Sequence, residues 1–435
     1  MRFLLLSSLL LALACGDDDG TVDPDLGTGM DAGPAGPSLR DAPVTFATVY
    51  EATRYTQGGY DRAYLPMDVA AHPNGQLWVV QQMERDGSFD ENTECTQRGL
   101  SGDPDDCVSL QGTTVAITDP AAVEPATEAN GRVRIVMDAN AWHFMRRPAA
   151  IAFGATELTL DPSDPGAAET GITEPLVLRD TFATCHEHWT GNPTDMPPFI
   201  GPTLWTSDPT IYDGTNGSFS WSNGSHLDMV HATQYCMGIA YESENVYWTF
   251  NGQYGLIDRY DFGAPHHPGH YDHDDGTVTR YLLPVGDEMA RVENVPSNMV
   301  IADRQLWIAD TGNGRVLRFD LDSPATRFGT FTSYEGYAGD TMEGMGYTPV
   351  LDRAALEAEW GGAAEPSGLT VLADGSVLVA NHATGHLTLL ESDGTIVRTI
   401  DTETGAGIGG LTTVGDTVYF VQMDQRRIVR IDLAE

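Results

Sequence analysis

Residues 295–321, VPSNMVIADRQLWIADTGNGRVLRFDL, decide how the chain folds. They predict three short strands, at 297–301, 305–309 and 315–320, because apolar, aromatic and β-branched residues dominate these segments. Asp, Asn and Gly residues separate the strands, as tight turns between antiparallel strands require. We therefore expect this stretch to form a meander of antiparallel strands.

The same phrase of an inner strand, a tight turn and a second strand recurs along the chain. The other five units begin near residues 65, 147, 236, 366 and 407. Six such units predict an all-β fold, a six-bladed β-propeller over 44–435. Residues 44–50, VTFATVY, have no partner of their own, so we expect this N-terminal strand to close the ring and cover the last exposed sheet edge.

Two segments depart from the regular pattern. The second unit carries an insertion at about 155–232, and its outer strands are expected within 202–213. Residues 352–359 alone have a helical pattern and predict a short helix.

The segment ADTGNGR, residues 309–315, resembles the telltale segment of NHL-type six-bladed propellers. In that family a strand ends in Ala-Asp and is followed by a Gly/Asn turn and an Arg-led strand. The resemblance covers roughly residues 44–434, and only this unit carries the segment in full. NHL-type propellers are frequently binding scaffolds, so the resemblance implies a ligand or partner bound at the mouth of the central channel.

Two groups of enzymes share this propeller architecture. The alternative function is therefore that of a metal-dependent lyase or hydrolase. The resemblance to peptidyl-hydroxyglycine amidating lyases implies His-bound zinc, and that to the gluconolactonase group implies calcium held by carboxylates and Asn. The lyase histidine of the Val-Pro-His phrase is Ser297 here, and only Asp310 and Asn381 match the lactonase pattern. Neither pattern is complete, so the sequence leaves open whether the protein is an enzyme.

The N-terminus predicts export. Residues 1–15 combine a positive charge at Arg2, an apolar run and a terminal Cys15, and the run is shorter than the roughly 20 residues of a spanning helix. This arrangement resembles a bacterial lipoprotein signal, which implies lipidation of Cys15; ordinary secretion with cleavage nearby remains the alternative. Residues 16–43, rich in Asp, Gly and Pro, predict a disordered tether. We expect an exported monomer, lipid-anchored in the bacterial cell envelope or secreted.

The charge balance restricts the partners. Sixty-three Asp and Glu against 23 Lys and Arg give a formal net charge of −40, which argues against binding to a nucleic acid backbone. The sequence has no phosphate-binding loop for a nucleotide cofactor and no Gly-x-Ser-x-Gly phrase. The expected partner is a small molecule, a peptide or a protein, with membrane contact through the lipid anchor only.

The cysteines predict two disulfides. Five are present, and lipidation of Cys15 leaves four in an oxidising compartment. Four thiols allow three pairings. We expect Cys95–Cys107, which flank one polar loop, and Cys185–Cys236, which would pair across the stretch of the long insertion that lies between them.

Propeller geometry gathers polar residues at the channel mouth, where second strands end and new blades begin. Aligned second-strand ends place Gln81, Cys185, Phe250, Asp310, Asn381 and Gln422 at equivalent positions. The expected ligand-binding residues are Arg147, Asn251, Asp310, Asn381 and Gln422. Imidazoles form sites for zinc or copper. The expected metal ligands at the mouth are His186, His188, His226, His231 and His382.

A second His- and Asp-rich loop, residues 265–276, lies between a third and a fourth strand and is expected on the opposite face. Alternating carboxylates suit a hard cation such as calcium, and imidazoles suit a transition metal. A solvated polar turn is the competing interpretation. The candidate ligands in this loop are His270, Asp272, His273, Asp274 and Asp275.

Overall fold

The structure, a computed structural model, describes residues 38–52, 55–57, 60–62, 64–83, 112–138, 140–190, 199–212, 224–333 and 338–433. The predicted export signal with Cys15, most of the predicted tether and the predicted Cys95–Cys107 pair lie outside these ranges. Residues 38–43, assigned to the tether from sequence, lie against one blade. There Leu39 is buried, and Arg40 forms ion pairs with Asp374 and Glu391.

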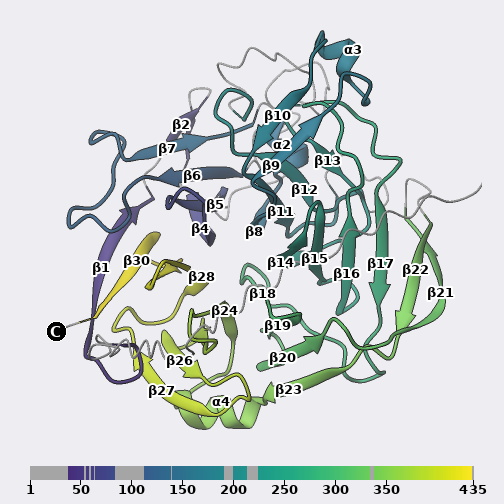
Figure 1. Cartoon of the computed structure of the whole chain (residues 1–435). Helices are drawn as coiled ribbons and strands as arrows, with labels where there is room; N and C mark the ends of the chain where they lie inside the picture. Colours follow the sequence, from purple (N-terminus) through teal and green to yellow (C-terminus); the bar gives the residue numbers. More distant parts are fainter. Residues whose placement is uncertain are drawn as a thin grey trace, which may run out of the picture.

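Six β-sheets surround a central axis as blades, which confirms the predicted six-bladed propeller (Figure 1). Each blade has four strands, which are named below in their order from the axis outward. Blade 1 is β4 (Tyr64–Ala71), β5 (Leu77–Met83), β6 (Thr113–Ile117) and β7 (Val133–Val136); blade 2 is β8 (Pro148–Phe153), β11 (Thr181–His186), β12 (Thr203–Thr206) and β13 (Asp228–Met229); blade 3 is β14 (Cys236–Ser243), β15 (Val246–Asn251), β16 (Leu256–Asp261) and β17 (Thr277–Tyr281). Blade 4 is β18 (Met299–Ala302), β19 (Gln305–Asp310), β20 (Arg315–Asp320) and β23 (Tyr347–Leu351); blade 5 is β24 (Pro366–Val371), β25 (Val377–Asn381), β26 (His386–Leu390) and β27 (Ile396–Asp401); blade 6 is β28 (Ile408–Val414), β29 (Thr417–Gln422), β30 (Arg427–Leu433) and β1 (Val44–Glu51).

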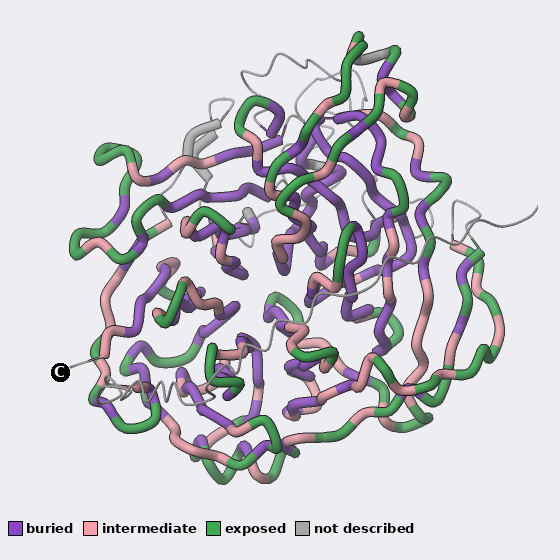
Figure 2. The backbone as a smooth tube through the Cα atoms, in the orientation of Figure 1, coloured by how far each residue is buried: buried purple, intermediate pink, exposed green. Residues whose placement is uncertain are grey.

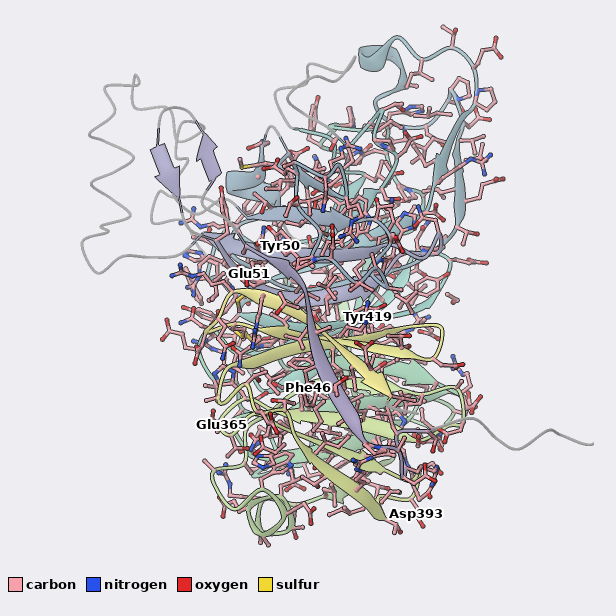
Figure 3. All side chains as sticks on the ribbon, turned by 90° about the vertical axis from the view of Figure 1, so that its left-hand side faces the viewer. Phe46, Tyr50, Glu51, Glu365, Asp393 and Tyr419 are labelled. Carbon is pink, nitrogen blue, oxygen red and sulfur yellow. A yellow bond between two sulfur atoms is a disulfide. The ribbon has the colours of Figure 1, made fainter. Side chains whose placement is uncertain are left out.

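The N-terminal strand closes the ring, as predicted. β1 pairs antiparallel with β30, from Val44 opposite Leu433 to Glu51 opposite Arg427. Figure 3 shows β1 running along the outside of blade 6, where the Phe46 ring meets the edge of Phe420 at a centroid distance of 6.3 Å. The outer edge of blade 6 is therefore covered by a strand from the opposite end of the chain.

The fourth strand of blade 2 lies beyond the range expected from sequence. β12 falls within 202–213, but β13 begins only at Asp228 and has two residues. The preceding insertion forms a separate hairpin, β9 (Glu157–Leu160) with β10 (Leu176–Arg179), which carries the one-turn helix α3 (Ala167–Thr170). β13 has only two residues, so only these two separate the segment that enters the strand from the segment that leaves it at the other end.

Blade 4 contributes a hairpin that the sequence did not predict. β21 (Thr326–Thr332) and β22 (Ala338–Glu343) leave blade 4 between its third and fourth strands, and β22 pairs in parallel with β17 of blade 3. The predicted short helix is present as α4 (Arg353–Trp360), and its N-terminal cap is the Asp352 carboxylate, which accepts a hydrogen bond from the Ala355 N–H at 2.8 Å.

Three minor elements complete the described chain: β2 (Tyr55–Gln57), β3 (Tyr60–Arg62) and α2 (Ala141–Phe144). No helix in these described ranges has the length and apolar content needed to cross a membrane.

The core lies between neighbouring blades, and Figure 2 shows buried segments inside the ring with exposed turns around it. Between blades 3 and 4, for example, Trp248 and Phe250 pack with Leu306 and Leu317. The predicted Cys185–Cys236 disulfide is confirmed. It joins the second strand of blade 2 to the first strand of blade 3, with the two Cα atoms 5.4 Å apart.

Two polar side chains cross-link the inner strands at the axis. The Asp68 carboxylate of blade 1 accepts hydrogen bonds from the N–H of Val69 at 2.8 Å and of Ile151, in blade 2, at 3.0 Å. In blade 4, the Asn298 side-chain oxygen accepts from Leu369 of blade 5 at 3.3 Å and Leu411 of blade 6 at 3.1 Å. Two side chains thus link five of the six blades, Asp68 joining blades 1 and 2 and Asn298 joining blades 4, 5 and 6.

Replacing Asn298 by Ala should destabilise the ring strongly, because the buried backbone N–H groups of Leu369 and Leu411 lose their hydrogen-bond acceptor. At about 1–3 kcal/mol for each unsatisfied group, the free energy of unfolding should fall by roughly 3 kcal/mol. Urea denaturation measures this change, and Asn74→Ala, in an exposed turn, is the matched control, expected within about 1 kcal/mol of wild type. A loss at Asn298 no larger than that of the control would contradict the cross-link.

Candidate functional site

A cavity of about 270 Å³ lies in the central channel, lined by the innermost strands of all six blades. Its wall is about equally polar and apolar, and Ile151, Ile239 and Leu369 are among the apolar lining residues. The polar lining groups are the Asp68 carboxylate, the Asn298 amide, and the hydroxyls of Tyr241, Thr370 and Thr412. A concave cavity that combines apolar side chains with a few convergent polar groups is the usual form of a small-molecule site.

The Asp68 carboxyl is the buried ionisable group of this cavity. It is 3% exposed, and burial raises its pKa to about 6, although hydrogen bonds from Ile151, Asn298 and Val69 act in the opposite direction. Asp68 was not among the site residues predicted from the sequence. The signal was present, since Asp68 follows Pro66 in its inner strand as Asn298 follows Pro296 in another.

The cavity opens away from the mouth at which the sequence analysis expected a ligand. Its lining residues belong to the parts of the inner strands that approach the first-to-second-strand turns. On the mouth side, five side chains that lie one or two positions before the first cavity-lining residue of their inner strand are fully buried: Met67, Ala149, Met237, Ser297 and Ser367. In Figure 3 the mouth side carries Glu51 and Glu365, and the opposite face carries Asp393.

Four of the five expected ligand-binding residues hold turns together. Asp310 accepts from the Ala290 N–H at 2.9 Å, Asn381 accepts from the Glu365 N–H at 3.0 Å, and Gln422 donates to the Ala406 carbonyl at 2.8 Å. In each case the partner belongs to the loop that enters the same blade. Asn251 differs in that it accepts from the Gln253 N–H within its own turn.

The strand register corrects the sequence alignment in two blades. Asn251 pairs with Cys236, and His186 pairs with Pro148, just as Asn381 pairs with Pro366. His186 and Asn251, rather than Cys185 and Phe250, therefore stand at the equivalent second-strand ends.

The fifth expected residue, Arg147, belongs to a buried ion cluster. Its guanidinium donates to the Glu187 carboxylate at 3.3 Å and to the Asn294 side chain. Arg291 donates to the same carboxylate at 2.9 Å and lies over the Tyr235 ring. Burial raises the pKa of Glu187, against the opposing effect of Arg147.

The structure joins members of the two histidine groups that the sequence analysis placed on opposite faces. The ligand atoms of His226, His266 and His273 all lie within 4.8 Å of one another, the sole such group of three in the part of the chain that the structure describes. His226 precedes the short β13 and so lies at the end that faces the β16–β17 loop, which holds the other two. His266 was missed as an individual ligand, although it belongs to the loop singled out from sequence.

The other expected metal ligands have different surroundings. His231 stacks on Phe199, with ring centroids 3.7 Å apart, and its ring centre is 5.9 Å from that of His273. The remaining three hydrogen-bond locally: His186 with the Thr184 hydroxyl at 3.1 Å, His188 with the Thr190 carbonyl at 2.6 Å, and His382 with the Ile408 carbonyl at 3.1 Å.

In the β16–β17 loop, the remaining candidate ligands shape the turn. His270 accepts from the Asp272 N–H, Asp272 accepts from the Asp274 N–H, and Asp275 accepts from the Ala264 N–H. These bonds favour a turn-forming role for the carboxylates over a calcium-binding one.

Ser207, His72 and Asp180 lie together beside another cavity, of about 480 Å³. Their hydrogen bonds do not have the geometry of a hydrolase triad. His72 accepts the Asn74 N–H on Nδ1, so a neutral ring carries its hydrogen on Nε2. That nitrogen is 2.9 Å from the Ser207 hydroxyl and 3.8 Å from Asp180, and it therefore donates to the serine rather than taking its proton. In a triad the carboxylate binds the opposite ring nitrogen.

Comparisons with known proteins return architectural likenesses. No protein family model and no curated protein matches the chain. Among solved structures, an auxiliary nutrient binding protein from Bacteroides thetaiotaomicron is 11% identical with a TM-score of 0.46, over 91% of this chain and 78% of that one. Virginiamycin B lyase from Staphylococcus aureus is 11% identical with a TM-score of 0.41, over 91% of this chain and 100% of that one. These values carry no argument about function, and the NHL resemblance stays a prediction.

The raised pKa of Asp68 predicts how stability depends on pH. The folded chain holds this proton more tightly than the unfolded chain, so the free energy of unfolding should fall as pH rises from about 4 through 6, by roughly 3 kcal/mol. Carbon-13 NMR of the side-chain carboxyl should give a midpoint near pH 6. Asp68→Asn should remove this component of the pH dependence, and a wild-type midpoint near pH 4 would contradict the assignment.

Proposed function

We propose that the protein is an exported binding propeller that holds a small ligand in its axial cavity, with a protonated amine directed at Asp68. The observation that carries the proposal is a single cavity built from all six inner strands, with one buried carboxylate among its few polar groups. Such cavities are the default location for a ligand in a protein of this shape.

The negative net charge of the protein favours a positively charged ligand. With a formal net charge of −40, the chain attracts cations and repels anions at long range. Inside the cavity, a cation near Asp68 offsets the desolvation of the carboxylate, whereas an anion adds to it. A small amine therefore matches the negative field of the protein, and its carbon atoms can pack against Ile151, Ile239 and Leu369 of the cavity wall.

Binding is favoured over the alternative of a metal-dependent lyase or hydrolase. The His226, His266 and His273 side chains are 0%, 0% and 7% exposed, so a bulky substrate has no approach to a metal held there. The Ser207–His72–Asp180 group has the wrong hydrogen-bond direction for nucleophilic catalysis.

Two features of the chain, its N-terminal segment and its disulfide, support export. The N-terminal residues resemble a lipoprotein signal, and the Cys185–Cys236 disulfide suits an oxidising compartment. We include lipidation of Cys15 in the proposal as the means by which the propeller is held at the cell envelope.

Two probes of equal shape and opposite charge test the ligand class. Cyclohexylamine at millimolar concentration should raise the melting temperature by at least about 2 °C, because it binds the folded state alone, and cyclohexanecarboxylate should not. Differential scanning calorimetry of the purified protein measures both.

Thr412→Phe, which fills the cavity from its wall, should abolish the amine effect, and Thr330→Phe, on the exposed outer strand β21, should preserve it. Equal shifts with both probes, or an amine shift that survives Thr412→Phe, would contradict the proposal.

A further inference from the structure

Three imidazoles meet where blade 2 adjoins blade 3, away from the axial cavity. His226 comes from the segment before β13, and His266 and His273 come from the loop between β16 and β17. One ligand nitrogen from each lies within 4.8 Å of the others. A single atom placed between them would contact two blades.

The backbone fixes the two segments against each other without help from any side chain. The His266 N–H donates to the Leu227 carbonyl at 3.1 Å, and the Gly269 N–H donates to the His226 carbonyl at 2.9 Å. The β9–β10 hairpin adds a third contact, since the His267 ring bonds the Asp161 carbonyl at 2.9 Å. The imidazoles are therefore held in place by rigid surroundings, as a prepared site requires.

The tautomer of His266 directs a lone pair into the cluster. Its Nδ1 is 2.7 Å from the His267 carbonyl oxygen, which can only accept, so Nδ1 carries the hydrogen. A neutral ring then has its lone pair on Nε2, and this buried atom has no hydrogen-bond partner. A backbone carbonyl that fixes the tautomer in this way is the usual companion of a metal-bound histidine.

The spacing of the other two rings fits a tetrahedral ion. His226 Nε2 and His273 Nε2 are 3.4 Å apart. Two nitrogens bound to zinc at roughly 2.0–2.1 Å in tetrahedral geometry are separated by about 3.3–3.4 Å. As a hydrogen bond, by contrast, 3.4 Å is long for two ring nitrogens, and it leaves His266 Nε2 unmatched.

The surroundings keep the rings neutral and dry. Phe144 stacks on His226 with centroids 3.6 Å apart and planes 16° apart. The side chains of His226, His266 and His273 are buried, and burial disfavours the charged form of an imidazole. Neutral imidazoles are the form that binds a metal, and no proton has to be displaced from them at neutral pH.

We propose that His226, His266 and His273 bind one transition-metal ion, zinc or copper, and that this ion links blade 2 to blade 3. Imidazole ligands suit these two metals, whereas calcium and magnesium require oxygen ligands. The fourth position of a tetrahedral ion remains for water or another small ligand.

Metal titration of the full purified chain tests the proposal. After chelator treatment and removal of the chelator, isothermal titration calorimetry with zinc chloride should give one tight site per chain, and bound zinc should raise the melting temperature. Copper(I) or copper(II) at the same one-to-one ratio supports the site equally and identifies the preferred metal. Binding of less than half an equivalent of both metals would overturn the proposal.

Variants locate the site. His266→Gln and His273→Gln should each weaken zinc binding by at least about 100-fold. His386→Gln, a half-buried histidine of blade 5 that bonds Thr384, should bind zinc as wild type does. Circular dichroism of the metal-free variants checks that they remain folded, and full binding by a folded His266→Gln would overturn the assignment.

A spectroscopic measurement on wild type keeps the test independent of any variant. X-ray absorption at the zinc edge should show three imidazole nitrogens at about 2.0–2.1 Å. A shell made only of oxygen, or with a single imidazole, would overturn the three-histidine site.

Discussion

The structure depends on satisfying the backbone amides that face the axis of the ring. Each inner strand approaches its neighbours so closely that a Cβ at Gly410 would lie 1.7 Å from an Asp68 oxygen. Register shifts in these strands, for example between Pro366 and Leu369, take local amides out of the blade ladders. Asp68 and Asn298, in opposing blades, supply the missing acceptors. Since a buried unpaired amide is costly, these two side chains determine that the ring closes tightly.

The same constraint determines where a ligand can enter. The buried residues before the axial cross-links lie toward the mouth, and the cavity is lined by the parts of the inner strands that lie nearer the opposite face. The carboxylate that satisfies the amides of Val69 and Ile151 therefore also becomes the ionisable group at the end of the cavity. One residue thus links the closure of the ring with the proposed choice of ligand.

The fold was predictable from sequence because each blade repeats a local pattern: an apolar inner strand, a turn and a second strand. The closing strand β1 was predictable because VTFATVY had no local partner. The Cys185–Cys236 pair was predictable because the two cysteines enclose the later part of the insertion. The histidine cluster was predictable only in its parts. Its assembly depends on the two-residue strand β13, too short to give any periodic signal, which brings His226 beside the β16–β17 loop. The turn-holding roles of Asp310, Asn381 and Gln422 were hidden for a similar reason, since their partners lie in loops distant in sequence.

Hydrogen exchange of the backbone amides of Ile151, Leu369 and Leu411 tests the central claim most directly. These amides border a solvent-accessible cavity, yet each donates to an axial side chain. The account predicts that they exchange as slowly as amides in the middle of the blades, because opening them requires the ring itself to open. Exchange as fast as that of exposed turn amides would show that Asp68 and Asn298 do not hold the inner strands together.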